Sequence, residues 1–253
     1  MWYAVVIGFF VVSLLLSALV SWILVAKYRH EKLLRSMFPG NVVEKLETGN
    51  ESFAESYENV TLFFSDIVNF TPMVSKLQPA AVVEILHELY CLFDNLALKH
   101  DIYKVETIGD AYMAVAGCPS KEDPVEAATK VANFAMDVVA AVRKLELKHQ
   151  SHQKIQIRIG IHSGPVMAGV VGKKMPRFCL FGDTVNTASR METTSEAMRV
   201  HVSSSTAELL ERGKSRIHIR KRGKIHLKGK GEVTTFWLEE DQQPVSGGCN
   251  YRA

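Results

Sequence analysis

The stretch Val60-Thr61-Leu62-Phe63-Phe64-Ser65-Asp66 has the β-branched and aromatic residues of a buried strand and ends on a carboxylate. A helical pattern of apolar residues follows over 77–100. Two further strands are expected over 103–107 and 111–116, and they flank Ile108-Gly109-Asp110, which predicts a hairpin with a tight turn. A buried strand, a helix and a hairpin therefore begin the fold.

The alternation of strands and helices continues toward the C-terminus. An amphipathic helix is expected over 124–147, and isoleucines at every second position of 155–161 are typical of a half-buried strand. Further strands are expected over 166–171 and 178–181 around a glycine-rich hairpin, and a short helix over 184–194. The pattern predicts an α+β fold in which helices flank a mixed sheet.

The chain opens with a run, Trp2 to Ala26, that contains no charged residue. At about 1.5 Å per helical residue, this run is long enough to cross the roughly 30 Å hydrocarbon core of a membrane. A signal peptide is the alternative, but it requires a basic start, a shorter apolar run and a cleavage site of small residues. Basic residues instead follow the run, so we expect a single-pass anchor with the remainder of the chain in the cytoplasm.

The predicted organisation has four parts. Residues 1–27 form a transmembrane helix, 28–58 a helical connector, 59–241 the catalytic domain and 242–253 a disordered tail. Residues 48–59 are polar and are expected to form a loop. The connector has an apolar stripe, which either packs on its own domain or forms a short parallel dimer helix.

Composition excludes some classes of function. The formal net charge of +3 is too small to indicate nucleic-acid binding. The four cysteines form no CxxC pair and have no histidine at zinc-binding spacing, so a reduced cytosolic setting is expected. The chain of 253 residues is long enough for one large domain with an additional element.

Two aspartates, Asp66 and Asp110, follow predicted strands, and if these strands are neighbours, both carboxylates point past the same edge of the sheet. Each alone is also typical of a turn or a helix cap. Together, two nearby carboxylates repel each other unless a cation lies between them, and Mg²⁺ prefers oxygen ligands. The pair therefore indicates a site for divalent metal ions that act on a phosphorylated substrate.

Polar residues on one predicted helix supply a second candidate group. Asn186 and Arg190 are four residues apart, so they share a helical face that can bind a sugar oxygen and a phosphoryl group. Lys228 and Lys230, each followed by glycine, can reach a triphosphate or form a plain basic turn. His162 is expected to be a packed strand histidine.

Four motifs together resemble the catalytic domain of class III adenylyl and guanylyl cyclases. They are Phe63–Thr71, Lys104–Tyr112, Arg158–Gly164 and Phe181–Met191, and the similarity extends from Leu33 to Glu239. The resemblance implies the ferredoxin-like sandwich of that family. The segment Leu33–Pro39 also looks like the connector that precedes such domains in receptor guanylyl cyclases.

The resemblance also implies roles for individual residues. Asp66 and Asp110, with the carbonyl of Ile67, would hold two Mg²⁺ or Mn²⁺ ions. Asn186 would orient the ribose, and Arg190 would stabilise the charge that develops on the α-phosphate. Lys228 would contact the triphosphate, with Lys230 as the alternative. In the family these groups come from two chains of a head-to-tail dimer, and this chain carries both halves, so a homodimer is implied.

The base is expected to be guanine. In the family the positions that distinguish the two purines correspond to Glu106 and Cys179, and guanylyl cyclases resemble this sequence there. A carboxylate accepts hydrogen bonds from the N1 and N2 donors of guanine, and Arg177 can donate to O6. We therefore expect conversion of GTP to cyclic GMP. The alternatives are an adenylate cyclase with an atypical base code and an inactive, dimerising regulator.

Overall fold

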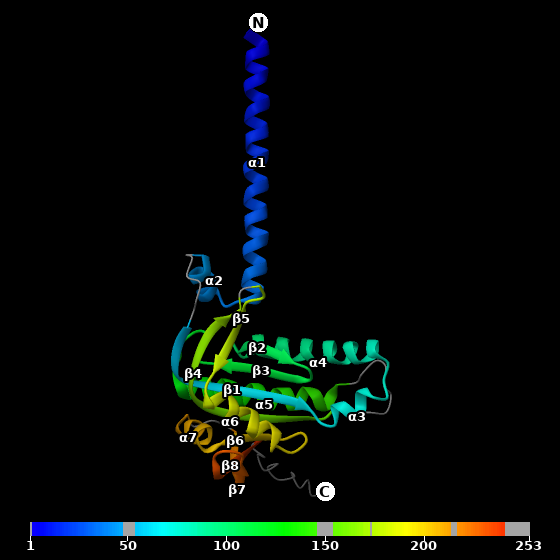
Figure 1. The fold of residues 1–253 in the computed structure, drawn as a ribbon, viewed down its shortest axis with the longest axis vertical. Coiled ribbons are helices and arrows are strands. Elements are labelled where there is room, and N and C mark those ends of the chain that lie inside the picture. The colour runs from blue at the N-terminus through cyan, green and yellow to red at the C-terminus, as the bar shows by residue number, and fades with distance from the viewer. Residues whose placement is uncertain (1, 48–53, 146–153, 173, 214–216, 241–253) are drawn as a thin grey trace, which may run out of the picture. The chain divides into compact units, whose positions relative to one another are not determined.

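The computed structural model describes residues 2–47, 54–145, 154–172, 174–213 and 217–240 (Figure 1). The predicted tail therefore lies outside the described residues. The chain divides into two compact units, one formed by Met1–Phe53 with Val171–Arg177 and the other by Ala54–Val170 with Phe178–Ala253.

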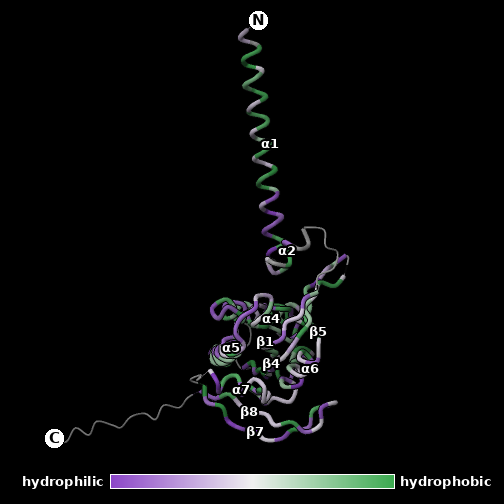
Figure 2. The backbone as a smooth tube through the Cα atoms, turned by 90° about the vertical axis from the view of Figure 1, so that its left-hand side faces the viewer, coloured by the Kyte–Doolittle hydropathy of each residue, from purple (hydrophilic) through white to green (hydrophobic). Residues whose placement is uncertain are grey.

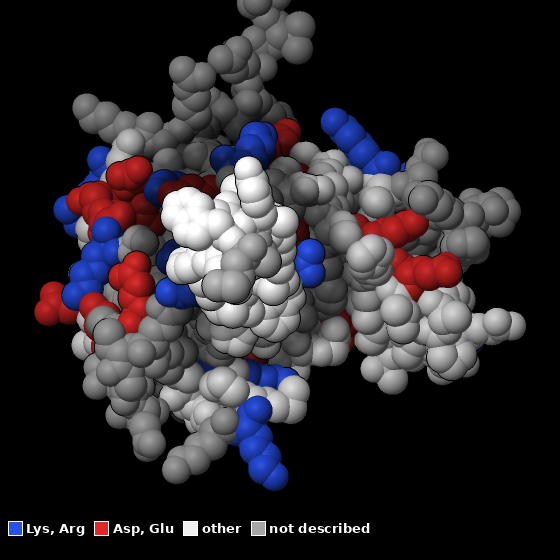
Figure 3. Space-filling model, turned by 90° about the horizontal axis from the view of Figure 1, so that it is seen from above, with Lys and Arg blue, Asp and Glu red and all other residues white. Residues whose placement is uncertain are grey.

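The first unit contains a long apolar helix. Helix α1 (Trp2–Met37) is continuous across the expected end of the membrane segment, and helix α2 (Gly40–Glu47) follows Pro39. The part Val5–Arg35 is long and apolar enough to cross a membrane, and none of its most apolar window is buried. Its apolar length is mostly green and white in Figure 2, and white in Figure 3, which looks along the helix from above. The last turns of α1 are purple in Figure 2 because they carry the basic residues.

The second unit is built around one mixed sheet. Its strands run in the order β2-β3-β1-β4-β6-β8-β7, and β5 pairs with β4. The pairings of this path are antiparallel, except that β4 and β6 are parallel. The strands are β1 (Ala54–Ile67), β2 (Tyr103–Ile108), β3 (Ala111–Ala116), β4 (Ile157–Val171), β5 (Arg177–Phe181), β6 (Val200–Ser203), β7 (His218–Leu227) and β8 (Gly231–Glu239). The helices are α3 (Phe70–Val74), α4 (Pro79–Lys99), α5 (Pro124–Lys144), α6 (Asp183–Thr193) and α7 (Ser204–Arg212).

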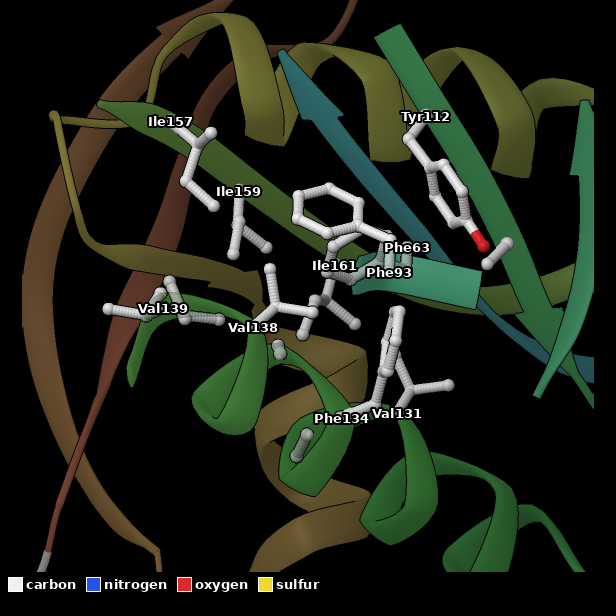
Figure 4. Packing of buried hydrophobic residues seen from close by; sticks show 14 of the residues in the cluster. Phe63, Phe93, Tyr112, Val131, Phe134, Val138, Val139, Ile157, Ile159 and Ile161 are labelled. Carbon is white, nitrogen blue, oxygen red and sulfur yellow. The ribbon is translucent and has the colours of Figure 1, made fainter. Parts of the chain in front are cut away.

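The core lies between the sheet and helix α5. Ile157, Ile159 and Ile161 are almost fully buried, and Figure 4 shows them on the same side of the sheet as Val138 and Phe134 of α5. Phe63 of β1 packs edge-on against Phe134, with 4.8 Å between ring centroids. Burial of each such side chain contributes about 1.5–3 kcal/mol to the free energy of folding. The predicted strand with isoleucines at every second position is confirmed.

Two details of the sheet differ from the sequence expectations. Strand β1 begins at Ala54, within the segment expected to be a loop, because Ala54–Tyr57 pair with β4 before a bulge between Tyr57 and Val60. Only Tyr57 of this part of the strand faces the core and is buried. The other residues are mostly polar, and for this reason the sequence did not indicate a strand here. Strand β4 is continuous, whereas two strands with a hairpin were expected.

The glycines of β4 allow helix α6 to approach the sheet. A Cβ on Gly160 would lie 1.9 Å from the backbone nitrogen of Glu192, and one on Gly164 would lie 2.8 Å from Oγ1 of Thr184. Because alternate residues of a strand face opposite sides, Gly160 faces α6 while its isoleucine neighbours face α5. The glycine pattern therefore marks close packing of a helix, and the interpretation as a hairpin was wrong.

Candidate active site

The turn that carries Asp110 lies beside the end of strand β1. Strand β3 pairs with β1 in a register that places Ser65 opposite Tyr112, so Asp66 comes next to the β2–β3 turn. Gly109 has a φ of 62°, in the left-handed region that glycine tolerates, and this conformation closes the turn directly before Asp110. The two aspartates singled out in the sequence are therefore neighbours.

The two carboxylates of this pair lie in different electrostatic environments. Burial, followed by the neighbouring Asp66, raises the pKa of Asp110 to about 7. The Asp66 carboxylate accepts hydrogen bonds from the backbone nitrogen of Ile67 at 3.0 Å and from Nη2 of Arg158 at 2.7 Å. Asp66 thus has compensation for its charge, whereas Asp110 retains its proton up to near-neutral pH.

Arg158 and Glu192 belong to this group, although sequence reasoning did not assign them to it. Arg158 lies opposite Asp66 in the β1–β4 pairing, and its Nε lies 3.3 Å from Oε1 of Glu192 at the end of α6. The two atoms are close enough for an ion pair, but their relative orientation does not allow a hydrogen bond. Burial, followed by the charge of Asp66, raises the pKa of Glu192 to about 7. Only the strand register could have identified Arg158, and only the packing of α6 could have identified Glu192.

The donor atoms at this end of the sheet fit a divalent cation. Two carboxylates and the carbonyl of Ile67 provide oxygen ligands alone, the chemistry that Mg²⁺ and Mn²⁺ prefer over sulfur or imidazole. Within the described residues, no group of three or more His, Cys, Asp or Glu side chains could hold a metal ion. Ions bound here therefore need further oxygens from water or from substrate phosphates.

The second candidate group gathers around helix α6. Asn186 is exposed on α6, and the guanidinium of Arg190 lies against the β7–β8 turn, where a Cβ on Gly229 would come within 4.0 Å of it. Lys230 of the same turn forms an ion pair with Asp183 at the start of α6. Lys228 is exposed, and no ion pair involves it within the described turn. Of the two lysines left open by the sequence, Lys228 has the freer ammonium group.

The residues expected to recognise the base come from strands β2 and β5. Glu106 follows a bulge in β2 and is half-buried, as is Cys179 in β5. The rings of Tyr103 and Phe178, one on each of these strands, pack edge-on with 5.8 Å between centroids. This contact ties together the strands that carry Glu106 and Cys179. Arg177, the first residue of β5, is exposed.

His162 has the environment of a packed strand histidine, as expected from the sequence. Its Nδ1 lies 2.7 Å from the hydroxyl of Ser203, and burial is the main cause that lowers its pKa to about 4. The imidazole is therefore neutral at physiological pH and is held by hydroxyl groups of β6 and α7.

The raised pKa of Asp110 predicts a pH-dependent gain in stability for Asp110→Asn in metal-free buffer. The unfolded carboxyl ionises near its ordinary pKa of 3.8, but the folded one ionises only near 7. The wild-type penalty therefore grows as pH rises from about 4 to 7 and is complete above 7. Allowing for solvent screening, we expect the variant to be about 1 kcal/mol more stable at pH 8, with the difference narrowing toward pH 5. Denaturant unfolding with a chelator measures this difference.

Asp137→Asn is the matched control for this experiment. Its carboxylate lies 2.6 Å from Nζ of Lys99 and 2.8 Å from Nε2 of His100, so loss of its charge is expected to destabilise the fold. Addition of Mn²⁺ is expected to favour the wild type over Asp110→Asn, because the ion stabilises the state that binds it. An Asp110→Asn variant less stable than the wild type at pH 8 without metal would contradict the repulsion described above.

Residues 53–240 match the family described as Adenylate and Guanylate cyclase catalytic domain. The chain is 48% identical over 214 residues to retinal guanylyl cyclase 2 of Homo sapiens, an alignment that covers 85% of this chain and 19% of that protein. The chain therefore spans less than a quarter of the length of this relative.

Solved structures have the same arrangement of sheet and helices. The guanylate cyclase domain of RhGC from Catenaria anguillulae, in complex with GTP, matches with a TM-score of 0.69 and 41% identity, covering 74% of this chain and 98% of that chain. A dimeric guanylyl cyclase domain of RhoGC from Blastocladiella emersonii, of non-standard form, matches with a TM-score of 0.66 and 38% identity, covering 74% and 98%. These matches confirm the predicted class III cyclase fold. Since the family match covers most of the chain, the chain belongs to the family of adenylate and guanylate cyclase catalytic domains.

Proposed function

We propose that this chain is a guanylate cyclase that converts GTP to 3′,5′-cyclic GMP and pyrophosphate. The observation that carries the proposal is the adjacency of the Asp66 and Asp110 carboxylates, since this pair needs a cation in a domain of the cyclase family. The similarity to a domain solved with GTP supports the choice of substrate. An adenylate cyclase with an atypical base code is the alternative within the same family.

The proposed site is divided between two groups of residues. Asp66, Asp110 and the carbonyl of Ile67 would hold two Mg²⁺ or Mn²⁺ ions. When bound, these ions lower the pKa of the ribose 3′ hydroxyl and offset charge on the phosphates. Asn186 orients the ribose by hydrogen bonding, and Arg190 lies against the transferred phosphoryl group, where its charge is worth most in the transition state.

The reaction is an internal displacement at the α-phosphorus. The ribose 3′ oxygen forms a bond to the α-phosphorus, its proton passes to water, and the bond to the bridging oxygen breaks so that pyrophosphate leaves with the electron pair. Lys228, with its free ammonium group, binds the triphosphate and favours departure of this leaving group. Alignment and charge stabilisation account for the rate enhancement, so no protein base is assigned.

The proposed enzyme works as a head-to-tail homodimer. Each chain carries both the carboxylate pair and the face of α6 with Asn186 and Arg190, so two chains related by a twofold axis could form two equivalent sites. The dimeric form of the related RhoGC domain supports association of such domains.

A membrane anchor is proposed for the N-terminal helix. The run Trp2–Ala26 is free of charge, and Lys27, Arg29 and Lys32 follow it, which favours a cytoplasmic catalytic domain by the positive-inside rule. The large apolar side chains of α1 are exposed, as expected for a surface that faces lipid.

Complementation between two inactive chains tests the shared site. Asp110→Ala and Arg190→Ala are each expected to lose roughly 100-fold or more in activity, because each removes a charge from the transition-state environment. When both chains are mixed at random, half of the dimers are mixed and each has one intact site of two, so about a quarter of wild-type activity should return. Cyclic GMP formation by the unfractionated mixture of differently tagged chains measures the recovery, and co-purification through both tags verifies that mixed dimers are present.

A mixture of Asp66→Ala and Asp110→Ala is the matched control. Both changes affect the same half of the site, so every site in a mixed dimer remains damaged and no recovery is expected. Verified mixed dimers of Asp110→Ala with Arg190→Ala that stay inactive would show that the two halves do not come from different chains.

The base assignment is tested by the double variant Glu106→Lys with Cys179→Asp. A lysine and an aspartate match the N1 acceptor and N6 donor of adenine and leave the guanine edge unpaired. We expect kcat/KM for GTP to fall roughly 100-fold and ATP to become the preferred substrate. Cys91→Asp, which changes an exposed cysteine on α4, is the control and should leave the preference for GTP intact. Strict use of GTP by the double variant would refute the assignment.

A further inference from the structure

The side chain of Tyr90 on helix α4 holds the turn that carries Asp110. Its hydroxyl donates a hydrogen bond of 2.8 Å to the carbonyl oxygen of Gly109, the residue directly before Asp110. Tyr90 is distant from Asp110 in sequence, and neither the hairpin pattern nor the helical pattern indicates a contact between them. The contact follows from the packing of α4 on the β2–β3 hairpin.

The ring of Tyr90 is itself held in place from two sides. It packs against the ring of Tyr112 with 5.8 Å between centroids, and Nζ of Lys104 lies 5.8 Å from the centroid of the Tyr90 ring. Asp94, one helical turn after Tyr90, accepts hydrogen bonds from Nζ of Lys104 at 2.9 Å and from the hydroxyl of Tyr112 at 2.8 Å. Two side chains of α4 therefore hold the hairpin: Asp94 binds residues of both strands, and Tyr90 binds the turn.

The turn has little other packing to fix it. Thr107, Ile108 and Gly109 are exposed, and a Cβ on Gly109 would meet no atom within 4 Å. Gly109 has a left-handed φ of 62°. Because glycine has no Cβ, other backbone conformations are also open to it unless a contact restrains it. A hydrogen bond from a rigid helix to its carbonyl is a restraint of this kind.

The hydroxyl of Tyr90 is a permanent donor in this position. Burial, followed by the negative charges of Asp110 and Asp66, raises the pKa of Tyr90 to about 12. The phenol is therefore protonated over the whole physiological range.

We propose that Tyr90 is a positioning residue for the metal site, and that its hydrogen bond to Gly109 fixes the turn so that Asp110 faces Asp66. The inference rests on the proposed function, since it assumes that this carboxylate pair binds divalent ions. Groups that orient metal ligands without touching the metal typically change metal affinity by about 10–100-fold when they are removed. Tyr90 acts on Asp110 through the backbone, and it is assigned no contact with substrate.

The test is Mn²⁺ binding by the detergent-solubilised chain of 253 residues without nucleotide. Tyr90→Phe keeps the ring and removes only the hydroxyl, so the packing on Tyr112 is preserved. We expect Mn²⁺ to bind roughly 10-fold more weakly to this variant by calorimetry or by electron paramagnetic resonance. With GTP, the Mn²⁺ concentration for half-maximal rate should rise by a similar factor, whereas the rate at saturating Mn²⁺ should remain near that of the wild type.

Tyr57→Phe is the matched control, because the hydroxyl of Tyr57 donates a bond of 2.9 Å to the carbonyl of Pro119, away from the turn. This variant should keep wild-type affinity for Mn²⁺. Hydrogen exchange of the segment 103–112 gives a second readout, independent of metal and activity: Tyr90→Phe should accelerate it and Tyr57→Phe should not.

Three results would overturn the proposal. Tyr90→Phe could bind Mn²⁺ as tightly as the wild type, with unchanged exchange in the turn. Tyr57→Phe could lose as much affinity as Tyr90→Phe, which would indicate general loosening of the fold. A wild-type chain that binds no Mn²⁺ would overturn the proposed metal site together with this inference, and is distinguishable from the other two because it concerns the unmodified chain.

Discussion

The antiparallel pairing of β1 with β3 on one side and β4 on the other is the constraint on which the candidate site depends. The first pairing places Asp66 beside the turn of Asp110, and the second places it opposite Arg158. The carboxylates are thereby held together, and burial, followed by the neighbouring Asp66, raises the pKa of Asp110. A pair maintained at this cost in a cyclase domain is best explained by a bound cation.

Helix α6 is anchored at both ends. At its start, Asp183 forms an ion pair with Lys230, and the Thr184 hydroxyl donates to the carbonyl of Pro165. Gly160 allows the backbone of α6 to approach β4 closely. His201 donates to the carbonyl of Met191 at 2.7 Å, and Arg222 donates to that of Thr194 at 2.6 Å, so β6 and β7 both hold the C-terminal end. Asn186 is exposed in the middle of the helix and Arg190 lies in its last turn, consistent with the proposal that they complete the site of a second chain.

The sequence predicted the fold class, because four long motifs and two clear periodicities agree with each other. It also predicted that Asp66 and Asp110 meet, because the resemblance to class III cyclases implies that they hold the same metal ions. It did not predict Arg158, Glu192 or Tyr90 as parts of the site, because their roles depend on strand register and helix packing. The true extent of β1 and β4 was likewise hidden, because polar pairing and glycine contacts with a helix have no distinct sequence pattern.

The carboxylate pair of this domain is proposed to support metal-dependent cyclisation of GTP. Product formation by the purified chain of 253 residues, with GTP and ATP assayed side by side in Mg²⁺, in Mn²⁺ and in a chelator, tests this proposal. We expect cyclic GMP and pyrophosphate in equal amounts from GTP, little product from ATP, and none with the chelator. A preference for ATP, or cyclic GMP formation that persists without divalent ions, would contradict it.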